Sequence, residues 1–166
     1  MTIMNDQQDY AALDTVIASA RSNGNVSTAL NLNVLKPDNL DSRLPRAAIT
    51  DAEGRELDLG SFAGDTTVTC APWSLIAVGQ KMWLDVDGTR YNGAATTHTL
   101  LKASAVTATQ VRDGLRLSLS RNWLESLRRG SAVEVRLAVT FNGSTDTSKK
   151  INFRISNYTL RNGGDL

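Results

Sequence analysis

Hydrophobic and polar side chains alternate along much of the chain after residue 25, and this pattern predicts β-strands. The strongest run covers 133–141, in which every second residue is apolar. Such a strand buries one face and leaves the other in water. Shorter runs recur about every ten residues, between turn signals such as Asn142-Gly143. The predicted strands are 30–35, 44–49, 57–59, 66–70, 80–87, 96–101, 115–119, 133–141, 151–155 and 158–160.

The order of these strands indicates the fold class. Long helices do not alternate with the strands, so a parallel α/β sheet is not expected. We predict an all-β protein built as an antiparallel β-sandwich, with a β-barrel as the alternative. The core is predicted from the apolar phase of the strands, and its members are Leu32, Val34, Val68, Met82, Leu84, Val86, Leu117, Leu119, Val135, Leu137, Val139, Phe153 and Ile155.

The N-terminal segment has helical rather than alternating spacing. Between residues 6 and 21 the apolar side chains recur three and four positions apart. Asn23-Gly24 then supplies the residue types that end a helix. Because the apolar stripe is narrow and rich in Ala, we expect this helix to dock, either on the rest of the chain or on a second subunit.

A second, short helix is predicted over 120–129, before the late strand 133–141. Ser120 or Asn122 can cap its start, and Gly130 ends it. Residues 107–111 are predicted as a single helical turn or a loop. The predicted organisation is a helical segment over 1–25, a β-sandwich over 26–161 and a flexible tail over 162–166.

Composition and charge exclude several classes of protein. The 166 residues suit one domain with a real core. With 18 basic and 17 acidic residues, the net charge of +1 lacks the basic excess of a nucleic-acid-binding protein. No apolar run approaches the roughly 18 residues that span a bilayer. The first ten residues are polar and acidic, unlike a signal peptide. We therefore expect a cytoplasmic protein or one exported by a leaderless route.

Residues that bear catalytic or metal-binding chemistry are few. Cys70 is the one cysteine, which excludes an internal disulfide, and with His98 it falls short of the about four ligands of structural zinc. A Cys70–His98 nucleophile is the catalytic alternative, but Cys70 continues the alternation of Val68 and is predicted in the core. His98 is predicted at the surface or a strand edge. Residues 85–88 resemble the start of a calcium loop but lack its later ligands, and are predicted as a hairpin turn. We predict no enzyme, metal or cofactor.

The tryptophans suggest where a ligand binds. Trp123 lies on the apolar face of the short helix and is predicted in the core. Trp83 lies on the polar face of its strand, where it either packs under the N-terminal helix or is exposed. Trp73 follows a proline in an apolar loop, which either closes one end of the sandwich or presents the ring to a sugar or a partner. The candidate binding residues are Trp73, Trp83 and Tyr91.

Several segments between residues 30 and 161 follow the order of a known type of module. They are 34–37 (Val-Leu-Lys-Pro), 44–45 (Leu-Pro), 67–73 (Thr-Val-Thr-Cys-Ala-Pro-Trp), 79–84 (Gly-Gln-Lys-Met-Trp-Leu), 133–135 (Val-Glu-Val), 141–144 (Phe-Asn-Gly-Ser) and 153–160. Together they resemble a bacterial Ig-like module of the kind found, often in tandem, in large and mostly uncharacterised surface or secreted proteins of gram-negative bacteria. The resemblance implies an Ig-like β-sandwich that acts as a spacer, a presentation module or a small adhesin-like domain, without catalytic residues.

Two features depart from that pattern, namely a single module instead of an array and an added N-terminal helix. Both argue for a role other than extending a rod. We therefore expect a non-enzymatic binding or assembly module with a protein or glycan partner, which forms homo-oligomers through the N-terminal helix. The alternative is a secreted effector or toxin-like protein that engages a membrane or receptor. A glycosidase needs two carboxylates about 5 to 9 Å apart, which no spacing here indicates.

Overall fold

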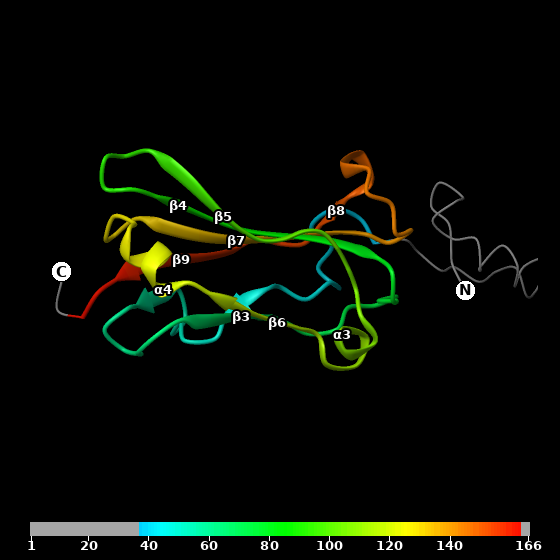
Figure 1. Ribbon diagram of the computed structural model, residues 1–166, viewed down its shortest axis with the longest axis horizontal. Coiled ribbons are helices and arrows are strands. Elements are labelled where there is room, and N and C mark those ends of the chain that lie inside the picture. Colours follow the sequence, from blue (N-terminus) through cyan, green and yellow to red (C-terminus); the bar gives the residue numbers. More distant parts are fainter. Residues whose placement is uncertain (1–36, 164–166) are drawn as a thin grey trace, which may run out of the picture.

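Strands with one apolar face form two separate sheets in the computed structural model of the chain, which describes residues 37–163 (Figure 1). The strands of the smaller sheet are β1 (Ala48–Ile49), β3 (Thr66–Cys70) and β6 (Leu115–Leu119), in the order β1-β3-β6. Those of the larger sheet are β2 (Glu56–Asp58), β9 (Ser156–Arg161), β7 (Ala132–Thr140), β4 (Lys81–Thr89) and β5 (Ala95–Ala105), in the order β2-β9-β7-β4-β5, and β8 (Ile151–Asn152) also pairs with β7.

The all-β prediction is confirmed, and the presence of two sheets makes the barrel alternative wrong. The antiparallel prediction needs one correction, because β2 runs parallel to β9, with Glu56 opposite Thr159. β2 and β9 are far apart along the chain, so their relative direction is set by the long connections between them rather than by a hairpin turn. The predicted helix within 6–21 and the predicted strand 30–35, with Leu32 and Val34, lie outside the described residues.

The core lies between the two sheets, and the strand registers align its members. On β4, Val86 lies opposite Val135 of β7 on one side and His98 of β5 on the other. The described residues of the predicted core are buried, apart from Leu117, which is half-buried, and Ile155. The largest fully buried side chains are Phe153, Leu44, Leu57, Leu59, Met82, Leu84, Leu119, Leu124, Leu127, Leu160 and Val68.

Ile155 was predicted in the core and is 39% exposed. The prediction is wrong because one continuous strand was expected over 151–155. Instead the chain leaves the sheet after β8 and re-enters it as β9, in which Ser156 and Tyr158 face inward. The buried positions therefore change from odd to even numbers between Phe153 and Ser156, and Ile155 falls in the break.

The dipeptide Asp87-Gly88 was predicted to turn the chain, but both residues lie inside β4. The turn comes later, where the N–H of Gly93 donates to the carbonyl of Arg90 over 2.9 Å. Gly88 serves packing instead, since a Cβ there would lie 2.6 Å from a methyl carbon of Leu127. A turn-forming residue type thus marks a close approach between a strand and a neighbouring side chain.

Two short α-helices lie near opposite ends of the layers (Figure 1). α3 (Ala108–Asp113) follows β5 and starts with a capping box, in which Thr107 accepts from the Gln110 N–H and the Gln110 side chain accepts from the Thr107 N–H. α4 (Arg121–Glu125) is capped by Ser120, which is one of the two residues predicted to cap it, and the helix is shorter than the predicted 120–129. A 3₁₀ turn, η2 (Thr147–Lys149), precedes β8. Within 37–163 no helix has the length and apolar character needed to cross a membrane.

Candidate functional site

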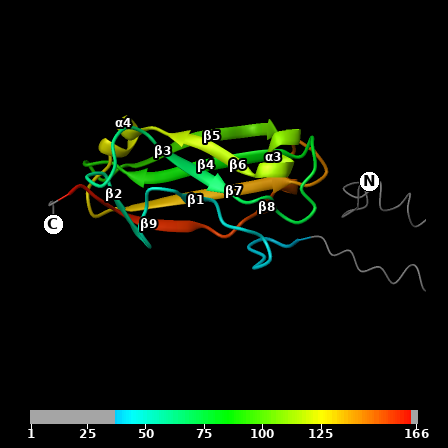
Figure 2. The same cartoon turned by 90° about the horizontal axis from the view of Figure 1, so that it is seen from below.

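One long side of the molecule leaves both sheets with an unpaired edge. β5 pairs with β4, and β6 pairs with β3, and in the described part of the chain neither has a strand on its other side. Both edges lie on the same side of the molecule (Figure 2). We call the surface between the edges of β5 and β6 the open side. An unpaired strand edge presents free N–H and C=O groups that can pair with another segment.

The opposite side of the molecule is closed by the chain itself. The segment before β1 crosses between the sheets and buries Leu44 and Ala47, both 1% exposed. The Ser156 hydroxyl donates to the Ala47 carbonyl over 2.5 Å, and the Ile49 N–H donates to the Tyr158 hydroxyl over 3.0 Å. These bonds join the smaller sheet to β9 of the larger one, so the two long sides differ in character.

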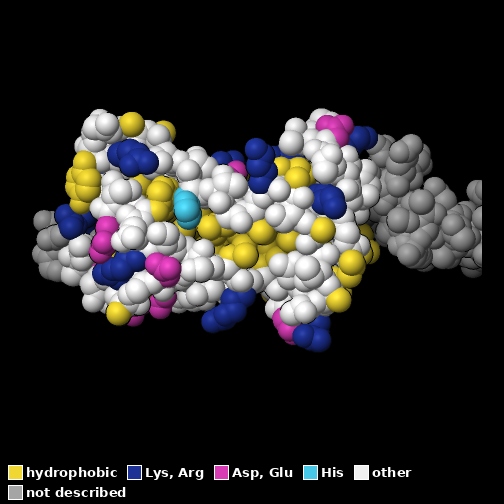
Figure 3. Space-filling view, viewed as in Figure 1, with side chains coloured by type: hydrophobic (Ala, Val, Ile, Leu, Met, Phe, Trp, Pro, Cys, Tyr) yellow, Lys and Arg dark blue, Asp and Glu magenta, His cyan; other side chains and the backbone are white. Residues whose placement is uncertain are grey.

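Half-buried hydrophobic side chains line the open side. Figure 3 shows a band of them between the two layers, with His98 at one end. Leu100 faces inward in the same phase of β5 as His98, and Leu117 faces inward from β6 between two buried leucines. Both pack against the core yet keep part of their surface in water, because no strand covers them in the described chain.

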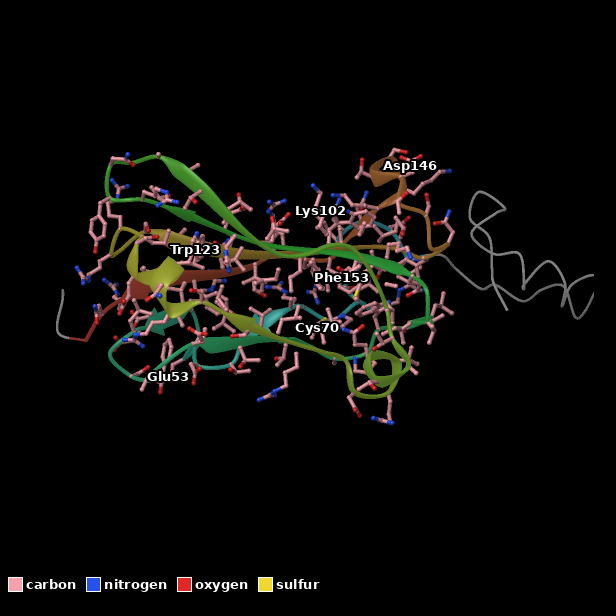
Figure 4. The ribbon with its side chains drawn as sticks, in the orientation of Figure 1. Glu53, Cys70, Lys102, Trp123, Asp146 and Phe153 are labelled. Carbon is pink, nitrogen blue, oxygen red and sulfur yellow. The ribbon has the colours of Figure 1, made fainter. Side chains whose placement is uncertain are left out.

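A ring stack closes one end of the open side. The imidazole of His98, on β5, lies 5.3 Å from the ring of Trp123, on α4, with an angle of 22° between the planes. Figure 4 labels Trp123 beside α4. Trp123 was predicted in the core and is half-buried against it, and His98 was predicted at the surface or an edge and is half-buried on the edge strand.

The candidate binding residue Trp73 lies in the loop between β3 and β4 and is 3% exposed. Its ring packs edge-on against Phe153 at 5.3 Å, and its indole N–H donates to the Gln80 side-chain oxygen over 3.2 Å. The loop therefore closes one end of the layers, in line with one of the two interpretations given for it. A ring packed in this way has no face free for a sugar.

Trp83 and Tyr91, the other two candidates, lie in different parts of the structure and differ in how exposed their rings are. Trp83 is on the outer face of the larger sheet and is 9% exposed, so of its two interpretations the exposed ring is wrong, and packing under the N-terminal helix involves residues outside the described ones. The ammonium of Lys150 lies 5.3 Å from its ring centroid and covers it. Tyr91 is 53% exposed in the β4–β5 turn, with the Arg129 guanidinium 6.0 Å from its ring centroid. Since Trp73 and Tyr91 flank opposite ends of β4, the structure does not bring the three together.

The acidic residues that resemble the start of a calcium loop form a hydrogen-bonded cluster on the outer face of the larger sheet. Asp85 accepts from the Thr99 hydroxyl over 2.6 Å, and Asp87 accepts from the Thr97 hydroxyl over 2.7 Å. Arg136 of β7 pairs with both carboxylates. Partial burial would raise the pKa of Asp87, but the bonds from Arg136 and Thr97 outweigh it and lower that pKa. Nowhere in 37–163 do three or more His, Cys, Asp or Glu side chains gather as metal ligands.

Cys70 points into the core from the end of β3, as predicted, and is 3% exposed. Burial raises the pKa of its thiol to about 12. A thiol with this pKa stays protonated at neutral pH, whereas a nucleophilic cysteine needs a depressed pKa. The side chain therefore acts in packing.

A hollow of about 670 Å³ lies between α3 and the ends of β3 and β6. Its polar lining includes Thr69, Thr107 and Gln110, of which Thr107 and Gln110 already bond each other in the α3 cap. Asp113 on its rim is paired with Arg112. The size suits a small ligand, but Thr107, Gln110 and Asp113 bond local partners rather than converging on one point.

Leu100 and Leu117, which line the open side, were not among the candidate binding residues predicted from the sequence, and Leu117 was predicted in the core. Alternation shows which face of a strand is buried but not which strand ends a sheet. Comparison of the chain with protein-family models, with curated proteins and with solved structures finds no match.

Proposed function

We propose that the protein is a non-enzymatic binding or assembly module that takes an extended segment of a protein partner on its open side. The observation that carries the proposal is the half-buried hydrophobic band between two unpaired strand edges. In strand addition, backbone groups of the edge supply the hydrogen bonds, and alternate side chains of the incoming segment fill an apolar gap. The open side offers both parts, the edges in β5 and β6 and the half-buried apolar surface at Leu100 and Leu117.

A protein partner suits this surface better than a glycan. Sugars are recognised by exposed aromatic faces with polar groups around them. Trp73 is packed on Phe153 and Trp83 is covered by Lys150, which leaves Tyr91 as the exposed ring among the three candidates. The open side is mostly aliphatic and suits Leu, Val or Ile side chains.

The proposal includes that the fold is Ig-like and that the protein is related to bacterial Ig-like modules. It rests on the order of the segments that resemble bacterial Ig-like modules, together with the two-sheet architecture. Modules of that kind serve as spacers, presentation units or adhesin-like domains, all of which work through contacts rather than chemistry. The protonated, buried Cys70 fits this reading.

Selection of binding peptides tests the proposed function. The full chain is immobilised and exposed to a displayed library of random eight-residue peptides. We expect the selected peptides to alternate apolar and polar residues. They should bind the Leu117→Lys variant about tenfold or more weakly, because an ammonium in the gap cannot be desolvated cheaply. Ser118→Lys is the matched control, one position along β6 and exposed, and should bind as the natural chain does. Peptides indifferent to Leu117→Lys would contradict the proposal.

One observation favours the alternative function, engagement of a membrane or receptor by an effector. The loop between β3 and β4 exposes Leu75 by 40% and Val78 by 65%. Apolar side chains at a loop tip can enter a lipid interface. Sedimentation of the full chain with anionic liposomes tests it. Binding that is lost in Val78→Asp would support this second function, and no binding would dismiss it.

A further inference from the structure

We infer that the segment taken up by the open side is residues 30–35 of a second copy of this chain, so that copies join head to tail. The inference rests on the proposed function, because it names the partner of the same surface. Its observations are the pattern of the segment, the place where the described chain begins, and the order of strands in the larger sheet.

Residues 30–35 have the character of an added strand. Leu30, Leu32 and Val34 alternate with Asn31 and Asn33, and the segment contains no charge and no proline. In an extended segment the three apolar side chains share one face and can enter an apolar gap, while the asparagines face water. At about 3.3 Å per residue the segment spans about 20 Å, close to the about 17 Å of the five-residue β6.

The regular part of β5 is the better acceptor edge. Its register with β4 is unbroken from Ala95 to Thr99, and the half-buried Leu100 is the extra residue of a bulge, because Leu101 rather than Leu100 lies opposite Leu84. Further along, the register shifts, Ala103 has a φ of 50°, and Lys102 is exposed. A bulge and a lysine are devices that keep other strands from an edge, so the edge is open from Ala95 to Thr99 and blocked from the bulge at Leu100 onward.

The chain's own segment cannot reach this edge. Asn39 and Leu40 are fixed to β8, where the Leu40 N–H donates to the Asn152 carbonyl over 2.7 Å and the Asn152 N–H donates to the Asn39 side chain over 2.8 Å. From β8 the strands follow as β7, β4 and β5, so a strand added to β5 lies four spacings, or about 19 Å, from β8. Residue 35 is four Cα-to-Cα steps from residue 39, and these steps extend over at most about 14 Å. Figure 2 shows the start of the described chain on the side of the molecule away from β5.

The described anchor at Asn39 and Leu40, which precedes β1, and the acceptor edge therefore lie on opposite sides of one molecule. A contact of this kind uses two different surfaces and leaves one of each free in every pair. Copies linked in this way form an open series that lengthens with concentration, rather than a closed dimer.

A complementation experiment tests the inference with the full chain. The donor variant carries Leu32→Lys and Val34→Lys, and the acceptor variant carries Leu117→Lys. Asn33→Lys and Ser118→Lys are the controls, one in each region on the polar phase. For the natural chain and both controls, we expect sedimentation velocity to show a series of oligomers that lengthens with concentration. Each variant alone should be a monomer. An equimolar mixture of the two variants should give a heterodimer that does not grow, because it contains one intact donor and one intact acceptor.

Other outcomes overturn the inference in distinguishable ways. A series that survives in the donor variant would overturn it while leaving the proposed function intact, provided that selected peptides still depend on Leu117. A natural chain that stays monomeric at all concentrations, or a mixture without heterodimer, would also overturn it. Circular dichroism and thermal unfolding establish that each variant is folded. If Leu117→Lys does not fold, Leu100→Lys replaces it on the β5 side of the gap.

Discussion

The imidazole of His98 stacks on the indole of Trp123, with the ring centroids 5.3 Å apart and the planes at 22°. His98 belongs to the edge strand β5 of the larger sheet, and Trp123 belongs to α4, which follows β6 of the smaller sheet. The stack therefore joins the two layers at one end of the open side, where no strand joins them in the described chain.

Removal of this stack should destabilise the protein, and the two rings should be coupled in the free energy of unfolding. We expect His98→Ala and Trp123→Leu to be less than additive in the free energy of unfolding, with a coupling of about 0.5 to 1.5 kcal/mol. Urea unfolding of the two single variants and the double variant measures it. A coupling near zero would show that the rings touch without contributing to stability. Thr97→Ala with Trp123→Leu is the control pair, because Thr97 faces Asp87 on the outer face.

Replacement of Cys70 should affect stability rather than function. Cys70→Ser places a hydroxyl in an apolar site and should cost about 1 to 2 kcal/mol, with peptide binding at the open side unchanged. A thiol reagent should label the native chain slowly and the urea-unfolded chain fast. Rapid native labelling together with loss of binding would contradict the packing role.

The raised pKa of Cys70 also predicts a pH dependence. Its folded pKa of about 12 lies above the ordinary thiol pKa of 9.0, so the folded state holds its proton more tightly than the unfolded state. The stability contributed by the neutral thiol is therefore present below about pH 9 and lost as the pH rises toward 12. Unfolding free energies measured from pH 8 to 10.5 should fall more steeply for the natural chain than for Cys70→Ala. Parallel curves would be the contrary result.

Much of the fold follows from local pattern. Alternation located the strands and most of the core, since burial on one face requires period two. It failed where tertiary packing decides the outcome. Gly88 resembled a turn residue but leaves room for Leu127, and Ile155 continued an apolar phase that the chain abandons between β8 and β9. The parallel pairing of β2 with β9 has no local signal, because it joins segments about a hundred residues apart.

The candidate site was harder to predict than the fold. Large aromatic side chains drew attention to Trp73, Trp83 and Tyr91, but burial and ion–ring contacts depend on loops whose path the sequence does not define. The open side is set by which strands end the sheets. Leu100 and Leu117 have the same alternation as any inward residue, and only the strand order exposes them.

Two glycines in positive φ provide a matched test of close packing. Gly114 has a φ of 82°, and a Cβ there would lie 2.2 Å from the Cys70 carbonyl oxygen, whereas Gly93 has a φ of 87° with no atom within 4 Å of such a Cβ. Gly93→Ala carries the backbone cost of a positive φ, about 1 to 2 kcal/mol, and Gly114→Ala carries more, because Gly114 combines its φ with a ψ of −168°, a region essentially limited to glycine. Gly114→Ala must also displace the backbone of β3 and should cost about 3 kcal/mol or more in total. Thermal unfolding compares them, and equal losses would show that the two backbones relax alike.

The Asp87–Arg136 pair predicts a small loss of stability at acidic pH. Burial alone would raise the pKa of Asp87, but the hydrogen bonds from Arg136 and Thr97 lower it below the ordinary aspartate pKa of 3.8. A carboxylate with a lowered folded pKa contributes stability above its unfolded pKa and loses it as the pH falls through the folded pKa. Because the Arg136 side chain is 44% exposed, solvent screens the pair and the contribution should be at most about 1 kcal/mol. Urea unfolding at pH 7 and pH 2.5 measures it in the natural chain and in Asp87→Asn. Asp87→Asn should be less stable than the natural chain at pH 7 and differ less from it at pH 2.5, whereas a difference that grows on acidification would reverse the sign and refute the assignment.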